Sequence, residues 1–131
     1  MKAKLNKEVK HREPFRPFAP ICRLEDADKW FKFGKYTRWM THNAEVINKV
    51  EEIEDIIHND GTARLQTVTR EQNSYIYDIL TEMDNQGLVP VIINTSFNRM
   101  GEPILNRYST ALKVRNETGL DMIITDKGVL H

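Results

Sequence analysis

The sequence is poor in several features that define protein classes. It contains a single cysteine, Cys22, which excludes an internal disulfide, and Cys22 with four scattered histidines shows no zinc-ligand spacing. No apolar run approaches the roughly 20 residues of a membrane-spanning helix. The N-terminus lacks the apolar segment of a signal peptide. These absences predict a cytoplasmic protein without a membrane segment.

An excess of charge of one sign is also missing. Lys and Arg number 19, as do Asp and Glu, so the formal net charge at pH 7 is +0. The charges are nevertheless segregated, because residues 1–23 are basic and residues 45–60 are acidic. This segregation either suits an anionic ligand near the N-terminus or is solvated surface. No basic stripe with interleaved aromatic residues is present, so nothing indicates a nucleic-acid partner.

A chain of 131 residues is long enough to bury a core without disulfides or metals. The lysine-rich residues 1–10 are predicted to be an exposed arm or linker, and residues 11–131 are predicted to be a single domain. The second half of the chain alternates between helix 70–86, strand 89–93, helix 109–117 and strand 122–125. Thr69 and Ser109 are the predicted N-caps of the two helices, and Gly87 and Gly119 are predicted to end them. With strand and loop in the first half, this order predicts an α/β or α+β fold.

The strand predicted at residues 89–93 is a β-branched apolar run, which is typical of a strand buried on both faces. It leads into Asn94-Thr95-Ser96-Phe97-Asn98, a loop rich in short donors and acceptors. In open α/β sheets, ligands bind at the carboxyl ends of strands, and such side chains suit a phosphate or acyl oxygen. The alternative is a polar turn that caps the strand, because Asn and Ser favour turns anyway.

A proline-rich segment near the N-terminus offers cationic groups. Prolines at every third position over residues 14–20 force an extended backbone. Arg12 and Arg16 therefore remain available to bind an oxyanion, for which the guanidinium is a planar fork of donors. The alternative is a proline-rich tether in which the arginines are incidental.

Residues 62–68 alternate between polar and apolar positions after an Asn-Asp-Gly turn signal. The alternation predicts one strand that places Thr62, Arg64 and Gln66 on a single face. That face is either solvated or one wall of a polar pocket.

Taken together and in order, three blocks of the sequence resemble the C-terminal region of the carbamoyltransferases that include the nodulation and antibiotic O-carbamoyltransferases. The blocks are Lys10–Pro20, Asp60–Val68, and Asn94–Asn98 followed by Gly101–Ile104. The resemblance extends from about Lys4 to Leu130, which is nearly the whole chain.

The resemblance implies a YrdC-like domain, a twisted mixed sheet flanked by helices that binds ATP and carbamoyl phosphate and forms a carbamoyl-adenylate. Such domains share a Lys-x-Arg and a Ser-x-Asn signature, here Lys10-His11-Arg12 and Ser96-Phe97-Asn98. The resemblance therefore implies that Lys10 and Arg12 hold phosphate oxygens. It likewise implies that Ser96 and Asn98 orient the triphosphate or the carbamoyl group. Mg²⁺ is expected to accompany ATP. Asp60 either helps to place the ion or is a turn residue, and no other metal ligand is predicted.

Further polar residues complete the predicted ligand site. Arg64 is the next candidate for a phosphate or carbamoyl phosphate contact, with Arg16 behind it. The remaining candidates for ligand binding are Thr62, Gln66, Asn94 and Thr95. Adenylation depends mainly on neutralising the charge of the leaving pyrophosphate and on in-line positioning, so no nucleophilic triad is required, and none is evident.

Full-length members of this family resemble a two-domain design, in which an N-terminal actin-like, metal-binding domain passes the carbamoyl group to an acceptor hydroxyl. The present sequence does not include that region, so complete transfer is expected to need a separate transfer domain or partner subunit. Two hypotheses follow. The chain is either the carbamoyl-adenylate-forming part of a carbamoyltransferase or a non-catalytic module that binds or sequesters a nucleotide.

Overall fold

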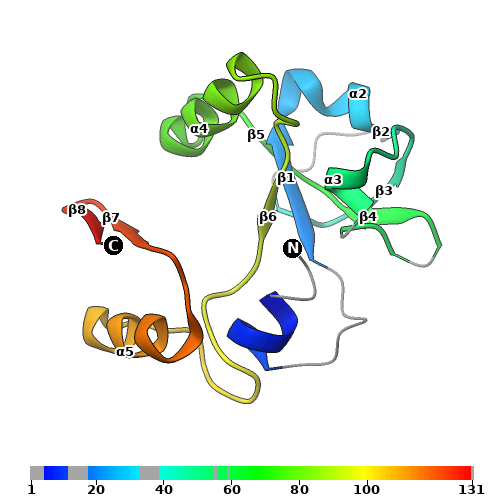
Figure 1. Cartoon of the computed structure of the whole chain (residues 1–131). Helices are drawn as coiled ribbons and strands as arrows, with labels where there is room; N and C mark the ends of the chain where they lie inside the picture. Colours follow the sequence, from blue (N-terminus) through cyan, green and yellow to red (C-terminus); the bar gives the residue numbers. More distant parts are fainter. Residues whose placement is uncertain (1–4, 12–17, 33–38, 55, 59, 131) are drawn as a thin grey trace. The chain divides into compact units, whose positions relative to one another are not determined.

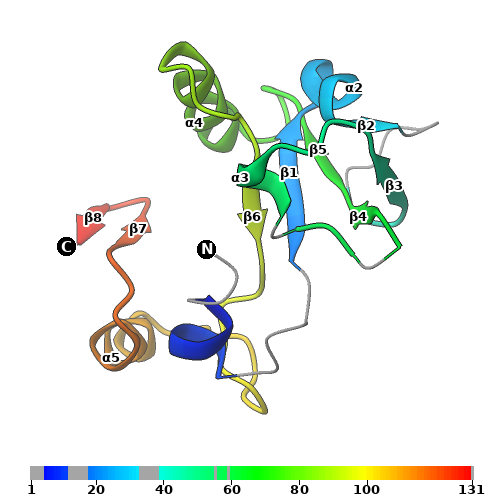
Figure 2. The same ribbon diagram turned by 45° about the vertical axis from the view of Figure 1, so that its right-hand side comes forward.

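The computed structural model describes most of the chain and divides it into two compact units. The first unit joins the two ends of the chain, Met1–Arg16 and Ser96–His131, and the second unit is the continuous segment Pro17–Thr95. Their mixture of helices and small sheets confirms the predicted α+β class (Figures 1 and 2). The described residues are 5–11, 18–32, 39–54, 56–58 and 60–130.

The central strand of the second unit is β1 (Ala19–Arg23), which is buried along its whole length. It lies between β5 (Gln66–Val68), to which it is parallel, and β6 (Ile92–Asn94), to which it is antiparallel (Figure 1). Strand β6 is only half-buried, and within the described residues it pairs with β1 alone. The prediction of a strand over residues 89–93 buried on both faces is therefore wrong. Pro90, just before β6, has no N–H to donate, which is typical of a sheet edge.

A second sheet of the same unit consists of β2 (Phe31–Lys32), β3 (Asn43–Val46) and β4 (Thr62–Arg64), all antiparallel. The single strand predicted over residues 62–68 is broken at Leu65, which is fully buried and separates β4 from β5.

This break corrects the prediction that Thr62, Arg64 and Gln66 line one face. The first two belong to the sheet of β4, whereas Gln66 begins β5 in the other sheet. The predicted alternation holds as far as Thr67, because Ala63, Leu65 and Thr67 are all buried, but it fails at Val68, which is buried as well.

Short helices connect these strands. They are η2 (Leu24–Asp26), α2 (Ala27–Trp30) and α3 (Glu51–Glu54). The first two follow β1 directly.

The longest helix of the second unit, α4 (Ser74–Asn85), begins later than predicted. Its N-cap is Asn73, whose Oδ1 accepts a hydrogen bond from the Ile76 N–H at 3.1 Å. The predicted cap at Thr69 is wrong, because the Thr69 carbonyl instead accepts from the N–H groups of Gln72 and Asn73 in a preceding turn. Gly87 follows the helix with a φ of +72°, a left-handed conformation that favours glycine, as predicted.

Helix α4 packs on one face of the β5-β1-β6 sheet. Leu80 is fully buried and forms a core cluster with Ile21 of β1 and Val68 of β5. Partly buried side chains pack around that cluster, namely Ile76, Met83 and Ile92.

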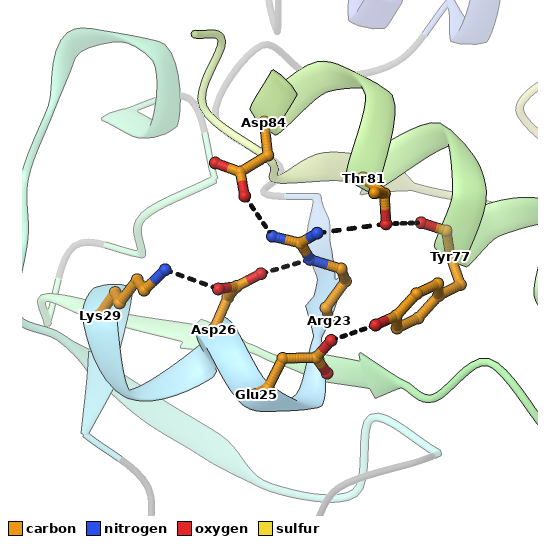
Figure 3. A network of polar contacts seen from close by, with 7 residues as sticks. All are labelled: Arg23, Glu25, Asp26, Lys29, Tyr77, Thr81 and Asp84. Atoms are coloured by element: carbon orange, nitrogen blue, oxygen red, sulfur yellow. Dashed lines mark hydrogen bonds and ion pairs between the residues drawn. The ribbon is translucent and has the colours of Figure 1, made fainter. Parts of the chain in front are cut away.

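A buried arginine attaches α4 to the end of β1 (Figure 3). Arg23 donates from Nε to Asp26, from Nη1 to Thr81 Oγ1 at 3.1 Å, and from Nη2 to Asp84 Oδ2 at 2.5 Å. Lys29 also donates to Asp26, at 2.7 Å. Arg23 and Asp26 are both buried, so each charge depends on its partners to offset the cost of leaving water.

The first unit contains η1 (Leu5–Lys10), α5 (Tyr108–Thr118), β7 (Ile123–Thr125) and β8 (Gly128–Leu130). Residues 1–10 were expected to form an exposed arm or linker. Their described part is a π-helix in which Asn6, Val9 and Lys10 are buried.

The C-terminal elements lie close to their predicted positions. Helix α5 has Arg107 rather than Ser109 at its N-cap, and it ends at Gly119 with a φ of +66°, as predicted. The strand predicted at residues 122–125 is β7, which pairs with β8 in a hairpin and is not fully buried. In the described parts of the chain, no helix is both long enough and apolar enough to span a membrane.

Leu80→Ala tests whether α4 and the sheet share one core. Because Leu80 is fully buried, the substitution should lower the free energy of unfolding by about 2–5 kcal/mol, as measured by urea denaturation. Leu88→Ala is the matched control, since Leu88 is 54% exposed and should lose little stability. Equal losses in the two variants would contradict the packing of α4 on β1.

Asp26→Asn tests the charge network through its pH dependence. Burial alone would raise the pKa of Asp26, but hydrogen bonds and positive charge from Lys29 and Arg23 lower it below the ordinary value of 3.8. The carboxylate therefore contributes stability above pH 3.8 that is lost as the pH falls through the lowered native-state pKa.

The stability advantage of the wild type over Asp26→Asn should accordingly shrink in acid, measured by urea denaturation at each pH. Asp28→Asn, which removes an exposed carboxylate from the adjoining helix α2, is the control. An advantage over Asp26→Asn that stayed constant down to the lowest pH would show that the ion pairs do not stabilise the fold.

Candidate functional site

The first unit contains a lysine that is buried against the Ser-x-Asn loop. Lys10 is 4% exposed, and its Nζ donates to the Ser96 carbonyl oxygen, to Ser96 Oγ at 3.3 Å, to the Asn98 carbonyl oxygen at 3.1 Å and to Asn98 Oδ1 at 3.0 Å. These residues lie 86 and 88 positions from Lys10 in the sequence. The structure therefore brings together three of the four residues that were predicted to be catalytic. We call Lys10, Ser96 and Asn98 the lysine cluster.

Hydrogen bonds within the loop fix the geometry of the lysine cluster. Ser96 Oγ donates to Asn98 Oδ1 at 2.6 Å, and Asn98 Nδ2 donates to the Glu102 carbonyl oxygen at 2.8 Å. The backbone closes the same circuit, because the Met100 N–H donates to the Lys10 carbonyl oxygen at 3.0 Å. The loop is thus tied to Lys10 by side-chain and backbone bonds together.

The arrangement is suited to holding an anion. The four oxygens of Ser96 and Asn98 that accept from Lys10 Nζ belong to neutral groups, and these contacts orient the ammonium. A phosphate oxygen that replaced one of them would form a charge-assisted hydrogen bond, which is shorter and stronger than a bond to a neutral acceptor. Ser96 Oγ can rotate its proton toward such a ligand, because a hydroxyl both donates and accepts.

Two predicted cations lie outside the described residues. These are Arg12, the fourth predicted catalytic residue, and Arg16. His11, which separates Lys10 from Arg12 in the sequence, is described and has a φ of +50°, a left-handed conformation that is uncommon for a residue other than glycine.

One cation of the first unit was missed by the sequence reasoning. Arg99 directly follows the Ser-x-Asn signature and forms an ion pair with Glu117 of α5. A hydrogen bond to Glu117 raises the pKa of Arg99 and, reciprocally, a hydrogen bond from Arg99 lowers the pKa of Glu117. Its position next to Asn98 was the available signal.

The ligand-binding candidates of the second unit are arranged differently from the prediction. Arg64 was expected to face a pocket, but its side chain is exposed on β4, opposite Asn43 of β3. Thr62 is partly buried and donates from its N–H and Oγ1 to Asp60 Oδ1, at 3.0 and 2.7 Å. Thr95 is exposed.

Two of these candidates do meet. Asn94 Nδ2 donates to Gln66 Oε1 at 2.7 Å, across the sheet from β6 to β5. Both side chains are half-buried, so they are partly accessible to a ligand.

Cys22 lies in the middle of β1 and is fully buried. Burial, followed by the negative charges of Asp26 and Glu25, raises the pKa of its thiol to about 12. The thiol is therefore protonated at neutral pH, and Cys22 is a core residue and not a nucleophile.

Comparison with known proteins places the whole chain in one family. The model of the family described as "Carbamoyltransferase C-terminus" matches residues 1–131. Nodulation protein NolO of Bradyrhizobium diazoefficiens is 37% identical over 127 residues, which cover 94% of this chain and 23% of NolO. The 3'-hydroxymethylcephem-O-carbamoyltransferase of Amycolatopsis lactamdurans is 35% identical over 120 residues, which cover 91% of this chain and 23% of that protein.

A third relative, nodulation protein U of Azorhizobium caulinodans, is 36% identical over 102 residues, which cover 77% of this chain and 18% of that protein. The chain thus spans only about a fifth to a quarter of the length of these relatives. Because the family model matches the full length of the chain, the assignment is clear: the chain belongs to the carbamoyltransferase C-terminus family.

Proposed function

We propose that this chain binds ATP and carbamoyl phosphate and forms a carbamoyl-adenylate. A separate actin-like transfer domain or subunit would then pass the carbamoyl group to an acceptor hydroxyl. The observation that carries the proposal is the lysine cluster, in which a buried ammonium is held by the loop that bears the Ser-x-Asn signature. Membership of the carbamoyltransferase C-terminus family and a relative named as an O-carbamoyltransferase support the same chemistry.

The residues of the lysine cluster fit a triphosphate. The Lys10 ammonium would exchange some of its neutral acceptors for a charged phosphate oxygen, and Ser96 Oγ would donate to the same phosphate or to the acyl oxygen. Arg12, two positions after Lys10 in the sequence, would supply a second cation, and its guanidinium suits a phosphate because it can bind two oxygens at once. Positive charge at this position stabilises a pyrophosphate as it leaves.

The proposed reaction balances with one water. Hydrolysis of carbamoyl phosphate gives carbamate and phosphate, and an oxygen of carbamate then attacks the α-phosphorus of ATP. A new carbamoyl O–P bond forms as the bond between the α-phosphorus and the oxygen bridging to the β-phosphate breaks, and pyrophosphate leaves. Each carbamoyl-adenylate is therefore accompanied by one phosphate and one pyrophosphate.

Mg²⁺ is proposed to enter with the nucleotide, bound to its phosphate oxygens. Across the described part of the chain there is no group of three or more His, Cys, Asp or Glu residues placed to hold a metal ion. The role proposed for the protein is to position the nucleotide and to stabilise the charge on its phosphates.

Lys10→Met tests the assignment of the phosphate site. The variant keeps an apolar stem but removes the ammonium, so the rate of pyrophosphate release from ATP, Mg²⁺ and carbamoyl phosphate should fall about 100-fold or more. Ser96→Ala should also lower the rate, because it removes a donor to the phosphate or acyl oxygen.

Lys127→Met is the matched control, because Lys127 is an exposed lysine of the same unit. It should release pyrophosphate at the wild-type rate, and thermal unfolding of each variant separates loss of chemistry from loss of folding. Wild-type turnover in a folded Lys10→Met protein would refute the site.

The same assay distinguishes the proposal from the alternative of a non-catalytic nucleotide-binding module. The wild-type chain should release pyrophosphate only when ATP and carbamoyl phosphate are both present. ATP binding measured by calorimetry without any pyrophosphate release would contradict adenylation by this chain and favour the binding module.

A further inference from the structure

Gln66 and Asn94 reach across the central strand of the second unit from its two neighbours. Gln66 begins β5 and pairs with Ile21, whereas Asn94 ends β6 and pairs with Ala19. Side chains alternate along a strand, so Ala19 and Ile21 share a face, and paired residues of adjacent strands point to the same face. The two amides therefore lie on one face of the sheet, where they form their 2.7 Å hydrogen bond.

The two ends of this sheet face differ in what covers them. At the Arg23 end it is covered by α4, which packs on Ile21 through Leu80 and is hydrogen bonded to Arg23 (Figures 1 and 2). At the Ala19 end the amides meet across β1, where the small side chain of Ala19 leaves room for them and is itself 2% exposed. Both amide side chains are half-buried, so each keeps part of its surface accessible at that end.

The pair retains hydrogen-bonding capacity of both kinds. Each primary amide carries two N–H donors and a carbonyl oxygen with two lone pairs, and their mutual bond uses one donor and one lone pair. Asn94 Oδ1 and the Gln66 Nε2 donors are outside that bond. Rotating both amides by 180° would exchange the atoms but would still offer a third group one acceptor and one donor.

We propose that Gln66 and Asn94 recognise the carbamoyl group, so that they select carbamoyl phosphate over acyl phosphates that have no amino group. The inference rests on the proposed function, and it assigns a specificity role to residues outside the lysine cluster. A carbamoyl group has an N–H donor and a carbonyl oxygen acceptor attached to the same carbon, which matches the acceptor and donor that the pair offers.

Acetyl phosphate is the discriminating probe, because it has the same carbonyl and phosphate but a methyl group in place of the amino group. A site built to accept an N–H is left with an unpaired oxygen when it meets a methyl group, and that penalty is larger than the value of the bond itself. We expect the wild-type chain to bind carbamoyl phosphate about tenfold or more tightly than acetyl phosphate.

The direct observable is the side-chain amide signals of Gln66 and Asn94 in ¹H–¹⁵N NMR spectra, assigned through Gln66→Glu and Asn94→Asp. Carbamoyl phosphate should shift both signals, whereas acetyl phosphate should shift them less at equal saturation of the site. The same titrations give the two dissociation constants.

Substitutions test the selectivity. Gln66→Ala and Asn94→Ala should reduce the preference for carbamoyl phosphate to about twofold or less, because each removes half of the matched pair. Gln66→Glu guards against a change in folding, since its carboxylate still accepts from Asn94 Nδ2 while the Nε2 donor is lost. Gln86→Ala is the control, because Gln86 is exposed and its Nε2 donates to Glu82 at 2.8 Å on α4; it should keep the wild-type ratio.

The outcomes separate this inference from the proposed function. A wild-type preference that persists in Gln66→Ala and Asn94→Ala, with pyrophosphate release intact, would overturn the inference alone. Shifts of the two amide signals by ATP without carbamoyl phosphate would reassign the pair to the adenine ring, and would also overturn it. Absence of carbamoyl phosphate binding and of pyrophosphate release would overturn the inference and the proposed function together.

Discussion

The contact between the Lys10 ammonium and the oxygens of Ser96 and Asn98 is the interaction on which the proposed site depends. It joins residues 86 and 88 positions apart, on either side of the entire second unit. The first unit is therefore discontinuous in sequence and is held together by bonds between its two segments. Because Lys10 is buried, removal of the ammonium would leave several loop oxygens without their donor.

In the proposed function, the same contact would contribute to acyl activation without covalent catalysis. Adenylation needs an anion to be held and a leaving group to be stabilised, and a fixed ammonium performs both tasks without forming a covalent bond. Cys22, whose pKa is raised to about 12 by burial, offers no thiolate for a covalent route. The second unit differs in the groups that it presents. Hydrogen bonds from Arg23 hold α4 on the sheet, and the neutral amides of Gln66 and Asn94 remain half-buried.

Local patterns in the sequence predicted the elements better than their pairing. Periodicity, together with Gly87 and Gly119, located α4 and α5. The start of α4 was misplaced, because Thr69 and Asn73 are both good N-cap residues and only the fold selects between them.

The central position of β1 was missed, since a strand that contains Pro20 and ends in Arg23 does not resemble a core strand. Arg23 can be buried only because Asp26 and Asp84 compensate its charge, and Asp84 is distant in sequence.

The site shows the same division. Ser96 and Asn98 stand out locally as a polar loop after an apolar run, whereas their proximity to Lys10 was predicted only through the family resemblance. The pairing of Gln66 with Asn94 depends on both strands flanking β1, so it follows from sheet topology and from no local pattern. Arg64 was assigned to a pocket on the assumption of one continuous strand over residues 62–68. No glycine or proline lies at Leu65 to indicate that the strand breaks there.

The central claim is that the Lys10 ammonium holds a phosphate of ATP. The most direct measurement is the ¹⁵N chemical shift of Lys10 Nζ during a titration with MgATP, with the ammonium of Lys29, which is bonded to Asp26, as an internal reference. The account predicts that the Lys10 signal shifts in a saturable manner while the Lys29 signal stays in place. A Lys10 signal that remained unchanged while the chain became saturated with ATP would contradict it.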